Sequence, residues 1–165
     1  MGVHSILHGY IREAYSGSRG TGCEEHAKLL AGNDREIWRN NESVLASLPV
    51  EDHWPPLSRN MFAYPPIGDF PITYKGRPMH FAASMKEVEW GLRDWLDKFE
   101  VLLGQLYWEK AVVYVDTAYL ADHVFSWRPK PLWVHQLSSG VLQPITEWEF
   151  SSTMGADDLE GLRAG

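Results

Sequence analysis

The chain of 165 residues has a single cysteine, Cys23, and no apolar run long enough to span a membrane. One cysteine excludes an internal disulfide and fits a reducing compartment. A membrane helix needs about 20 mostly apolar residues, and the first residues lack the basic and apolar regions of a signal peptide. We therefore expect a cytoplasmic protein with no membrane partner.

Motifs for catalysis and nucleotide binding are also missing. The glycine-rich residues 17–22 lack the lysine and the spacing of a phosphate-binding loop. Cys23 precedes two glutamates, which oppose formation of a thiolate. Asp116 and Glu13 are the carboxylates best placed for acid–base chemistry, although a carboxylate in a turn or at a strand edge is the commoner interpretation. We assign no catalytic residue and no cofactor.

The histidines do not have the spacing of a metal site. His4 and His8 share one face of an expected strand but lie about 13 Å apart along it, which is too far for one ion. The other histidines have no partner at ligand spacing. We therefore assign no metal-binding residue.

Charge is distributed unevenly along the chain. Residues 1–85 carry nine acidic and eight basic side chains, whereas residues 86–165 carry thirteen acidic and seven basic ones. An acidic surface repels phosphate backbones and attracts basic partners. We therefore expect no nucleic-acid partner and favour a basic protein as the partner. The eight tryptophans suit both a core and a protein interface.

The length is that of one domain. We expect a single α+β domain over residues 1–150 and an acidic, flexible tail over residues 151–165. The order of strands and helices predicts one antiparallel or mixed sheet with two main helices on one face, in a split βαβ-like arrangement. Strands are expected at residues 3–13, 61–64, 72–74, 79–83, 111–115 and 122–127, with residues 133–137 and 146–150 as short strands or packed loops.

Two helices are expected. The first starts near residue 24, with a break at Gly32 left open, and ends before Pro49. The second follows a capping-box pattern, Ser84-x-x-Glu87. Its apolar stripe consists of Val88, Leu92, Trp95, Leu96, Phe99, Leu102, Leu103 and Leu106.

The opposite side of the second helix provides a candidate partner-binding site. Trp90, Asp94, Asp97 and Val101 have the spacing of one helical face. An aromatic side chain among carboxylates on an outward face is typical of an anchor for a basic partner. The alternative is that the C-terminal segment folds back and covers Trp90.

A second candidate segment lies near the C-terminus. Glu147, Trp148 and Glu149 alternate charge and aromatic character, as in an edge strand. We include these three residues among the expected partner contacts.

Several short motifs are similar to those of a known group of proteins. They are Ser47-Leu48-Pro49, Trp54-Pro55-Pro56-Leu57, Met61-Phe62, His80-Phe81-Ala82-Ala83-Ser84 and Trp95-Leu96-x-Lys98-Phe99-Glu100-x-Leu102-Leu103, with His8-Gly9-Tyr10-Ile11 near the start. Over about residues 6–128 the chain resembles bacterial immunity proteins of polymorphic toxin systems. The resemblance implies a cytoplasmic inhibitor that binds and neutralises a cognate toxin domain, with no catalytic residues to carry over.

Two other classes of function remain open. A small enzyme or ligand-binding domain would use a pocket between the sheet and the helices. An acidic inhibitor that mimics nucleic acid would need carboxylates in a regular array.

Overall fold

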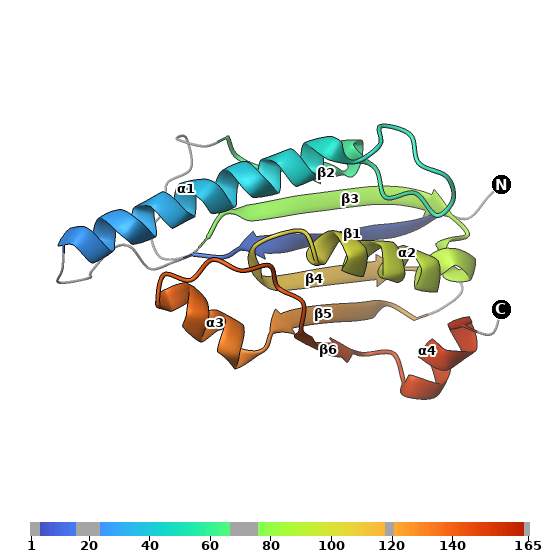
Figure 1. Ribbon diagram of the computed structural model, residues 1–165. Helices are drawn as coiled ribbons and strands as arrows, with labels where there is room; N and C mark the ends of the chain where they lie inside the picture. Colours follow the sequence, from blue (N-terminus) through green and yellow to red (C-terminus); the bar gives the residue numbers. More distant parts are fainter. Residues whose placement is uncertain (1–3, 16–23, 67–75, 118–120, 164–165) are drawn as a thin grey trace.

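The computed structural model describes residues 4–15, 24–66, 76–117 and 121–163 (Figure 1). These residues form one six-stranded antiparallel sheet with the strand order β2-β3-β1-β4-β5-β6. The strands are β1 (His4–Glu13), β2 (Phe62–Ala63), β3 (Pro78–Lys86), β4 (Trp108–Asp116), β5 (His123–Pro129) and β6 (Trp148–Ser152). The helices are α1 (Glu24–Ser47), α2 (Val88–Leu103), α3 (Pro131–Ser138) and α4 (Ala156–Arg163), and a short 3-10 helix, η1 (Arg59–Met61), precedes β2.

The first strand of the chain lies near the centre of the sheet. β1 pairs antiparallel with β3 on one side and with β4 on the other, so β3 and β4 run parallel to each other with β1 between them. α2 connects β3 to β4, which completes a split βαβ unit. The expected α+β fold, with one sheet and two main helices, is confirmed.

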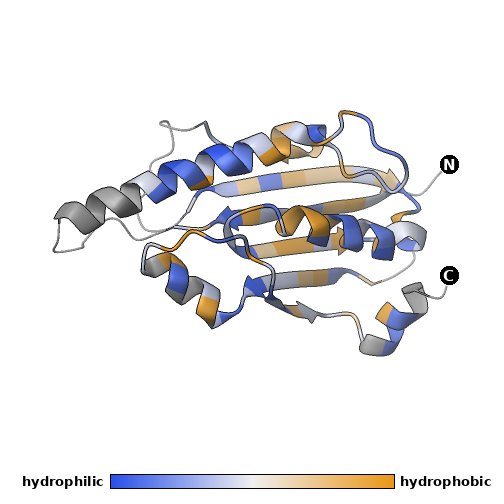
Figure 2. Ribbon diagram, viewed as in Figure 1, coloured by the Kyte–Doolittle hydropathy of each residue, from blue (hydrophilic) through white to orange (hydrophobic). Residues whose placement is uncertain are grey.

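The two faces of the sheet differ in burial. Side chains of a strand alternate between its faces, and in β1 Leu7 and Ile11 are fully buried whereas His8 is exposed. The buried side carries the helices, and Figure 2 shows apolar residues concentrated on the strands and on the inner part of α2. The opposite side is polar and aromatic, with His8 stacked on Tyr114.

The expected stripe of α2 forms the centre of the core. All eight of its residues are buried. Phe99 is fully buried, and its ring lies 5.2 Å from Trp95, 5.3 Å from Phe81 and 5.2 Å from Trp127. α2 therefore packs across the sheet from β3 to β5.

α1 is one continuous helix. No break occurs at Gly32, and the helix ends two residues before Pro49, as the sequence predicts. Ile37, Asn41 and Leu45 follow one another at a spacing of four residues and are almost fully buried against the sheet.

A buried polar network fixes α1 to the sheet. The guanidinium of Arg77 donates to both carboxylate oxygens of Glu13, at 2.6 and 3.2 Å, and to Glu42 at 2.6 Å. Asn41 donates to Glu13 at 2.9 Å and to the carbonyl of Tyr107. Burial raises the pKa of the Glu13 carboxyl, and the Arg77 and Asn41 bonds oppose that rise. The network joins the end of β1, the start of β3 and the middle of α1.

Three local expectations differ from the structure. Ser84 does not cap α2, because it lies within β3 opposite Ile6, and Glu87 precedes the helix with a φ of 59°. Residues 133–137 lie in the helix α3, with Pro131 as its first residue, a favoured position for proline. The segment expected to be a flexible tail instead extends β6 to Ser152 and forms α4.

α4 has an apolar anchor on the domain. Met154 is buried in the core, and Leu159 packs against it. α4 also contacts α2. These contacts explain why the C-terminal segment joins the fold despite its acidic composition.

Candidate protein-binding surface on α2

The structure brings the four predicted residues of α2 together on one exposed face. Trp90 is 84% exposed and Val101 is 67% exposed, and Asp94 and Asp97 lie between them, also exposed. At about 100° per residue the four side chains fall within an arc of about 60°. We call these four residues the α2 outer face. The alternative in which the C-terminal segment covers Trp90 is wrong, because α4 contacts α2 without covering that side chain.

An irregular segment, residues 49–57, is held against this helix. The ammonium of Lys98 donates to Asp52 at 2.8 Å and to the carbonyls of His53 and Pro55 at 3.0 and 2.8 Å. The indole N–H of Trp95 donates to the carbonyl of Pro56 at 3.0 Å. α2 thereby satisfies three backbone carbonyls of an otherwise irregular segment.

The same segment exposes two further apolar side chains. Trp54 is 49% exposed and Val50 is 48% exposed. A side chain at Gly91 would approach the Trp54 indole nitrogen to 3.0 Å, which shows that Trp54 lies directly against α2 next to Trp90. Sequence reasoning did not assign these two residues to the site. Their placement depends on a contact between segments about 40 residues apart, for which the local sequence carries no signal.

An open groove of about 420 Å³ runs between α2 and this segment. Leu48, Leu57 and Leu102 line it together with Val101, and Asp94 and Asp97 lie along it. An apolar floor with carboxylates at its side accommodates the aliphatic stem of a lysine or arginine and binds its charged end.

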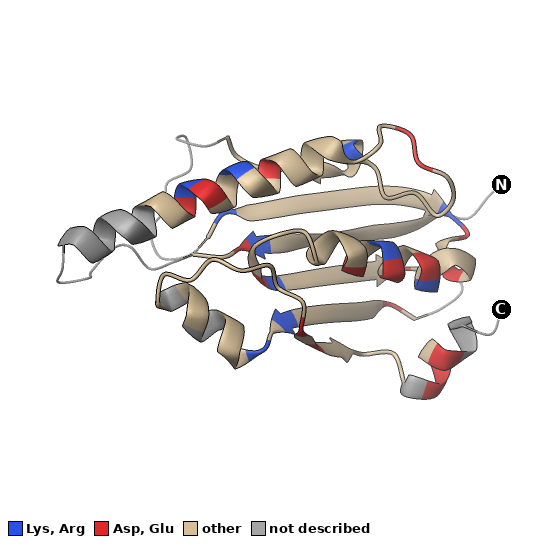
Figure 3. Ribbon diagram, in the orientation of Figure 1, with Lys and Arg blue, Asp and Glu red and all other residues tan. Residues whose placement is uncertain are grey.

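Cations interleave with the carboxylates of α2. Arg93 binds Asp97 at 2.8 Å, one helical turn away, and Lys98 binds Asp52. Figure 3 shows this alternation on α1 and α2, whereas the described part of α4 is mainly acidic. Such alternation does not resemble the continuous row of negative charge along a nucleic-acid backbone.

The second predicted segment lies on a different part of the molecule. Glu149 is paired with Arg128 across the sheet and points to the side without helices, because the neighbours of Arg128 are buried on the helix side. Trp148 is half-buried against Trp108, and Glu147 binds Lys130 at 3.1 Å. β6 is one of the two edge strands of the sheet, and β2 is the other. The structure therefore separates residues 147–149 from the α2 outer face.

The remaining sequence candidates do not converge on a chemical site. Asp116 pairs with Ile6 near the start of β1, whereas Glu13 ends that strand, about 23 Å further along. Asp116 is exposed and Glu13 is fully buried. His4 and His8 are both exposed on the side of the sheet without helices. Cys23 and residues 17–22 lie outside the described residues.

Neither a metal-binding cluster nor a membrane-spanning helix occurs among the described residues. They contain no group of three histidine, cysteine, aspartate or glutamate side chains close enough to hold a metal ion. None of the described helices has the length and apolar character needed to cross a bilayer.

The wall of the groove supports a prediction for Asp52. Its carboxylate accepts bonds from Lys98 and from the backbone N–H groups of His53 and Leu57. The Lys98 bond lowers the pKa of Asp52 below its ordinary value of 3.8, burial opposes the change, and the Leu57 N–H adds to it. We expect Asp52→Asn to cost about 1.5–3 kcal/mol of unfolding free energy at pH 6, the usual range for bonds to a charged group.

This cost should shrink on acidification. A depressed folded-state pKa contributes stability above the unfolded value, and that contribution is lost as the pH falls below 3.8. Urea unfolding at pH 6 and pH 3 measures the difference, with Asp122→Asn as a control at an exposed aspartate. A cost that is the same at both pH values would contradict the assigned ion pair.

Comparison of the chain with protein-family models, with curated proteins and with solved structures gives no significant match.

Proposed function

We propose that this protein is a cytoplasmic bacterial immunity protein, which binds and neutralises a cognate toxin domain through the α2 outer face. The observation that carries the proposal is the 84% exposure of Trp90 on a helix that also presents Asp94 and Asp97. Exposing a large aromatic side chain to water is unfavourable. Tryptophan is also among the commonest anchors of protein interfaces. The chain's short motifs, similar to those of immunity proteins, support the same conclusion.

The partner is a protein with a basic contact surface. Trp54, which lies against Gly91, and Val101 add exposed apolar area to the helix that carries Trp90, and Asp94 and Asp97 lie on the same helix. Desolvation of the aromatic side chain holds such a complex together, while complementary charge mainly speeds the encounter. Inhibition is stoichiometric, because one bound copy blocks one toxin domain.

The test is a titration of the purified protein against the toxin domain encoded beside its gene, paired with a survival assay in cells that express both. We expect Trp90→Ala to raise the dissociation rate at least about 30-fold, the equivalent of a hot-spot residue. Leu132→Ala is the matched control, because Leu132 is 62% exposed on α3. It should leave the dissociation rate and cell survival unchanged.

Charge reversal at two places tests whether the position of the carboxylates, or only the net charge of the protein, speeds association. Asp94→Lys with Asp97→Lys should slow association about tenfold at low salt and flatten its salt dependence. The double variant Asp157→Lys with Asp158→Lys alters net charge by the same amount on α4 and should have a smaller effect. Equal effects of the two double variants, or protection that survives all three α2 substitutions, would refute the α2 outer face as the binding site.

A further inference from the structure

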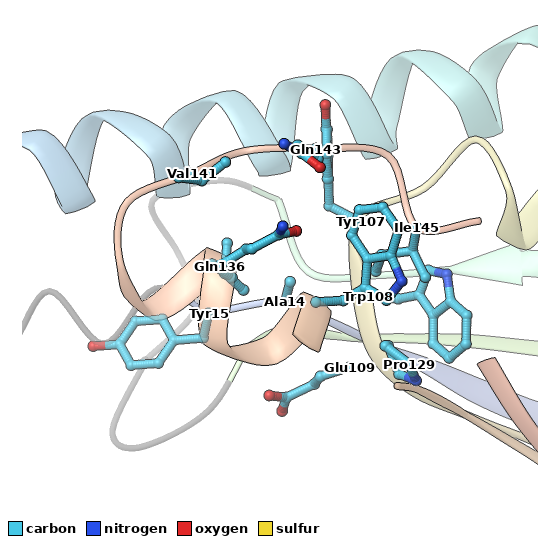
Figure 4. A pocket seen from close by; sticks show the side chains of 12 residues that line it. Ala14, Tyr15, Tyr107, Trp108, Glu109, Pro129, Gln136, Val141, Gln143 and Ile145 are labelled. Carbon is cyan, nitrogen blue, oxygen red and sulfur yellow. The ribbon is translucent and has the colours of Figure 1, made fainter. Parts of the chain in front are cut away.

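A second site, unrelated to the groove, lies beneath α3. A cavity of about 90 Å³ is enclosed between the end of β1, the start of β4 and α3 (Figure 4). Ala14, Trp108, Trp133, Leu137 and Ile145 provide its apolar lining. None of its lining residues belongs to the groove beside α2.

The chain closes over this cavity through a defined helix end. Gly140 follows α3 with a φ of 84°, a conformation that favours glycine. The N–H groups of Gly140 and Val141 donate to the carbonyls of Leu137 and Gln136, at 3.0 and 2.9 Å, which is the Schellman pattern. Asn33 of α1 binds the carbonyl of Gly140 at 2.9 Å. Residues 141–145 are thereby directed back over the cavity.

The side chain of Gln136 in the cavity wall has an unsatisfied acceptor. The side-chain oxygen of Gln136 is buried and has no hydrogen bond within the described part of the chain. Figure 4 shows its amide directed into the space beneath residues 141–145. A buried acceptor without a donor is unfavourable, so a ligand donor placed there is bound selectively.

Two further polar side chains at the wall already have partners within the protein. The indole N–H of Trp108 donates to the carbonyl of Leu103 at 2.9 Å, so this residue offers its ring to the cavity. The carboxylate of Glu109 forms an ion pair with Arg12. The site therefore has no free charge from these groups to attract an ion.

We propose that the cavity beneath α3 binds a small uncharged ring compound that carries one N–H or O–H donor, which bonds to Gln136. At about 90 Å³ the cavity is smaller than the dry cavity of about 150 Å³ that takes benzene, so a bound ring lies only partly inside it. Val141 is 41% exposed and Gln143 is exposed, so the cavity reaches solvent beside residues 141–145. The rest of the ring lies at that opening.

The test uses three single-ring probes on the intact protein, followed by the backbone amide signals of residues 141–145 in NMR titrations. Phenol carries the donor, benzene lacks it, and pyridine carries an acceptor. We expect saturable binding of phenol, about two- to tenfold tighter than benzene, the usual effect of one net hydrogen bond. Pyridine should bind more weakly than phenol.

Gln136→Leu should reduce the preference for phenol over benzene to about one while benzene still binds. Gln105→Leu, at an exposed glutamine after α2, is the matched control and should retain the preference. The proposal is overturned if phenol gives no saturable shifts at residues 141–145, if phenol and benzene bind equally to the wild-type protein, or if pyridine binds more tightly. It is also overturned if Gln136→Leu keeps the phenol preference. If the Gln136→Leu variant is unstable, the binding of phenol, benzene and pyridine to the wild-type protein still tests the proposal.

Discussion

Phe99→Ala should lower the free energy of unfolding by about 3–5 kcal/mol, the usual range for truncating a buried aromatic side chain. Phe99 is fully buried, and its ring contacts Trp95 on the same helix, Phe81 on β3 and Trp127 on β5. These three rings come from different elements and cannot all move to fill the space. The lost contacts and the cavity therefore both add to the cost.

Urea unfolding of the two proteins measures the effect. Val101→Ala on the opposite side of α2 is the control, because Val101 is 67% exposed, and it should change stability by less than about 0.5 kcal/mol. A cost below about 1 kcal/mol for Phe99→Ala, with an unchanged slope against urea, would mean that α2 does not pack on the sheet as described.

Arg77→Met should cost about 3–5 kcal/mol at pH 7, because it leaves the carboxylate of Glu13 buried without its cationic partner. Arg77 is 2% exposed and Glu13 is fully buried, so water cannot replace the lost bonds. Arg93→Met removes an arginine from a more exposed ion pair with Asp97. That control should cost less than about 1 kcal/mol.

The loss of unfolding free energy caused by Arg77→Met should decrease as the pH falls from 7 towards 4.5. Burial raises the pKa of Glu13 above its ordinary value of 4.5, and in this variant the opposing Arg77 bonds are gone. A raised folded-state pKa favours the folded protein at low pH, and that benefit is lost as the pH rises. Adding Glu13→Gln should restore part of the stability at pH 7. If this loss of stability instead grows on acidification, the buried ion pair of Glu13 with Arg77 is contradicted.

The sequence predicts the helices whose apolar residues recur at a regular helical spacing. The stripe of α2 and the buried face of α1 follow from helical spacing, because each helix buries one side against the same sheet. A strand was also expected at residues 3–13, and β1 spans His4–Glu13. Trp90, Asp94, Asp97 and Val101 were found as the remainder of the α2 pattern, and the structure exposes all four.

Other features depend on contacts that no local pattern encodes. Ser84 and Glu87 have the spacing of a capping box, yet pairing of Ser84 with Ile6 continues β3 and delays the helix. A break at Gly32 was open because glycine disfavours a helix, but the helix continues through it. In α3 the signals were present, with Pro131 at the start and Gly140 after the end, but the helix is only eight residues long.

The candidate binding surface was predicted only in part, because some of its contacts also join segments that are distant in the sequence. The segment that carries Trp54 is held on α2 by the Lys98 and Trp95 bonds, which join parts of the chain that are distant in the sequence. The pairing of Glu13 with Arg77 spans 64 residues. The cavity beneath α3 needs β1, β4 and α3 to be assembled before it exists.

The central position of β1 also determines when this protein can fold during its synthesis. β1 is made before β3 and β4, and Leu7 pairs with Ala83 on one side and with Val115 on the other. At about 5–20 residues per second, translation leaves the apolar side chains of β1 without their partners for several seconds. Leu7 has strands on both sides only after Val115, 108 residues later in the chain, has been made (115 − 7 = 108). A nascent chain stalled before β4 would therefore expose an apolar, unpaired strand, which is the kind of segment that chaperones bind.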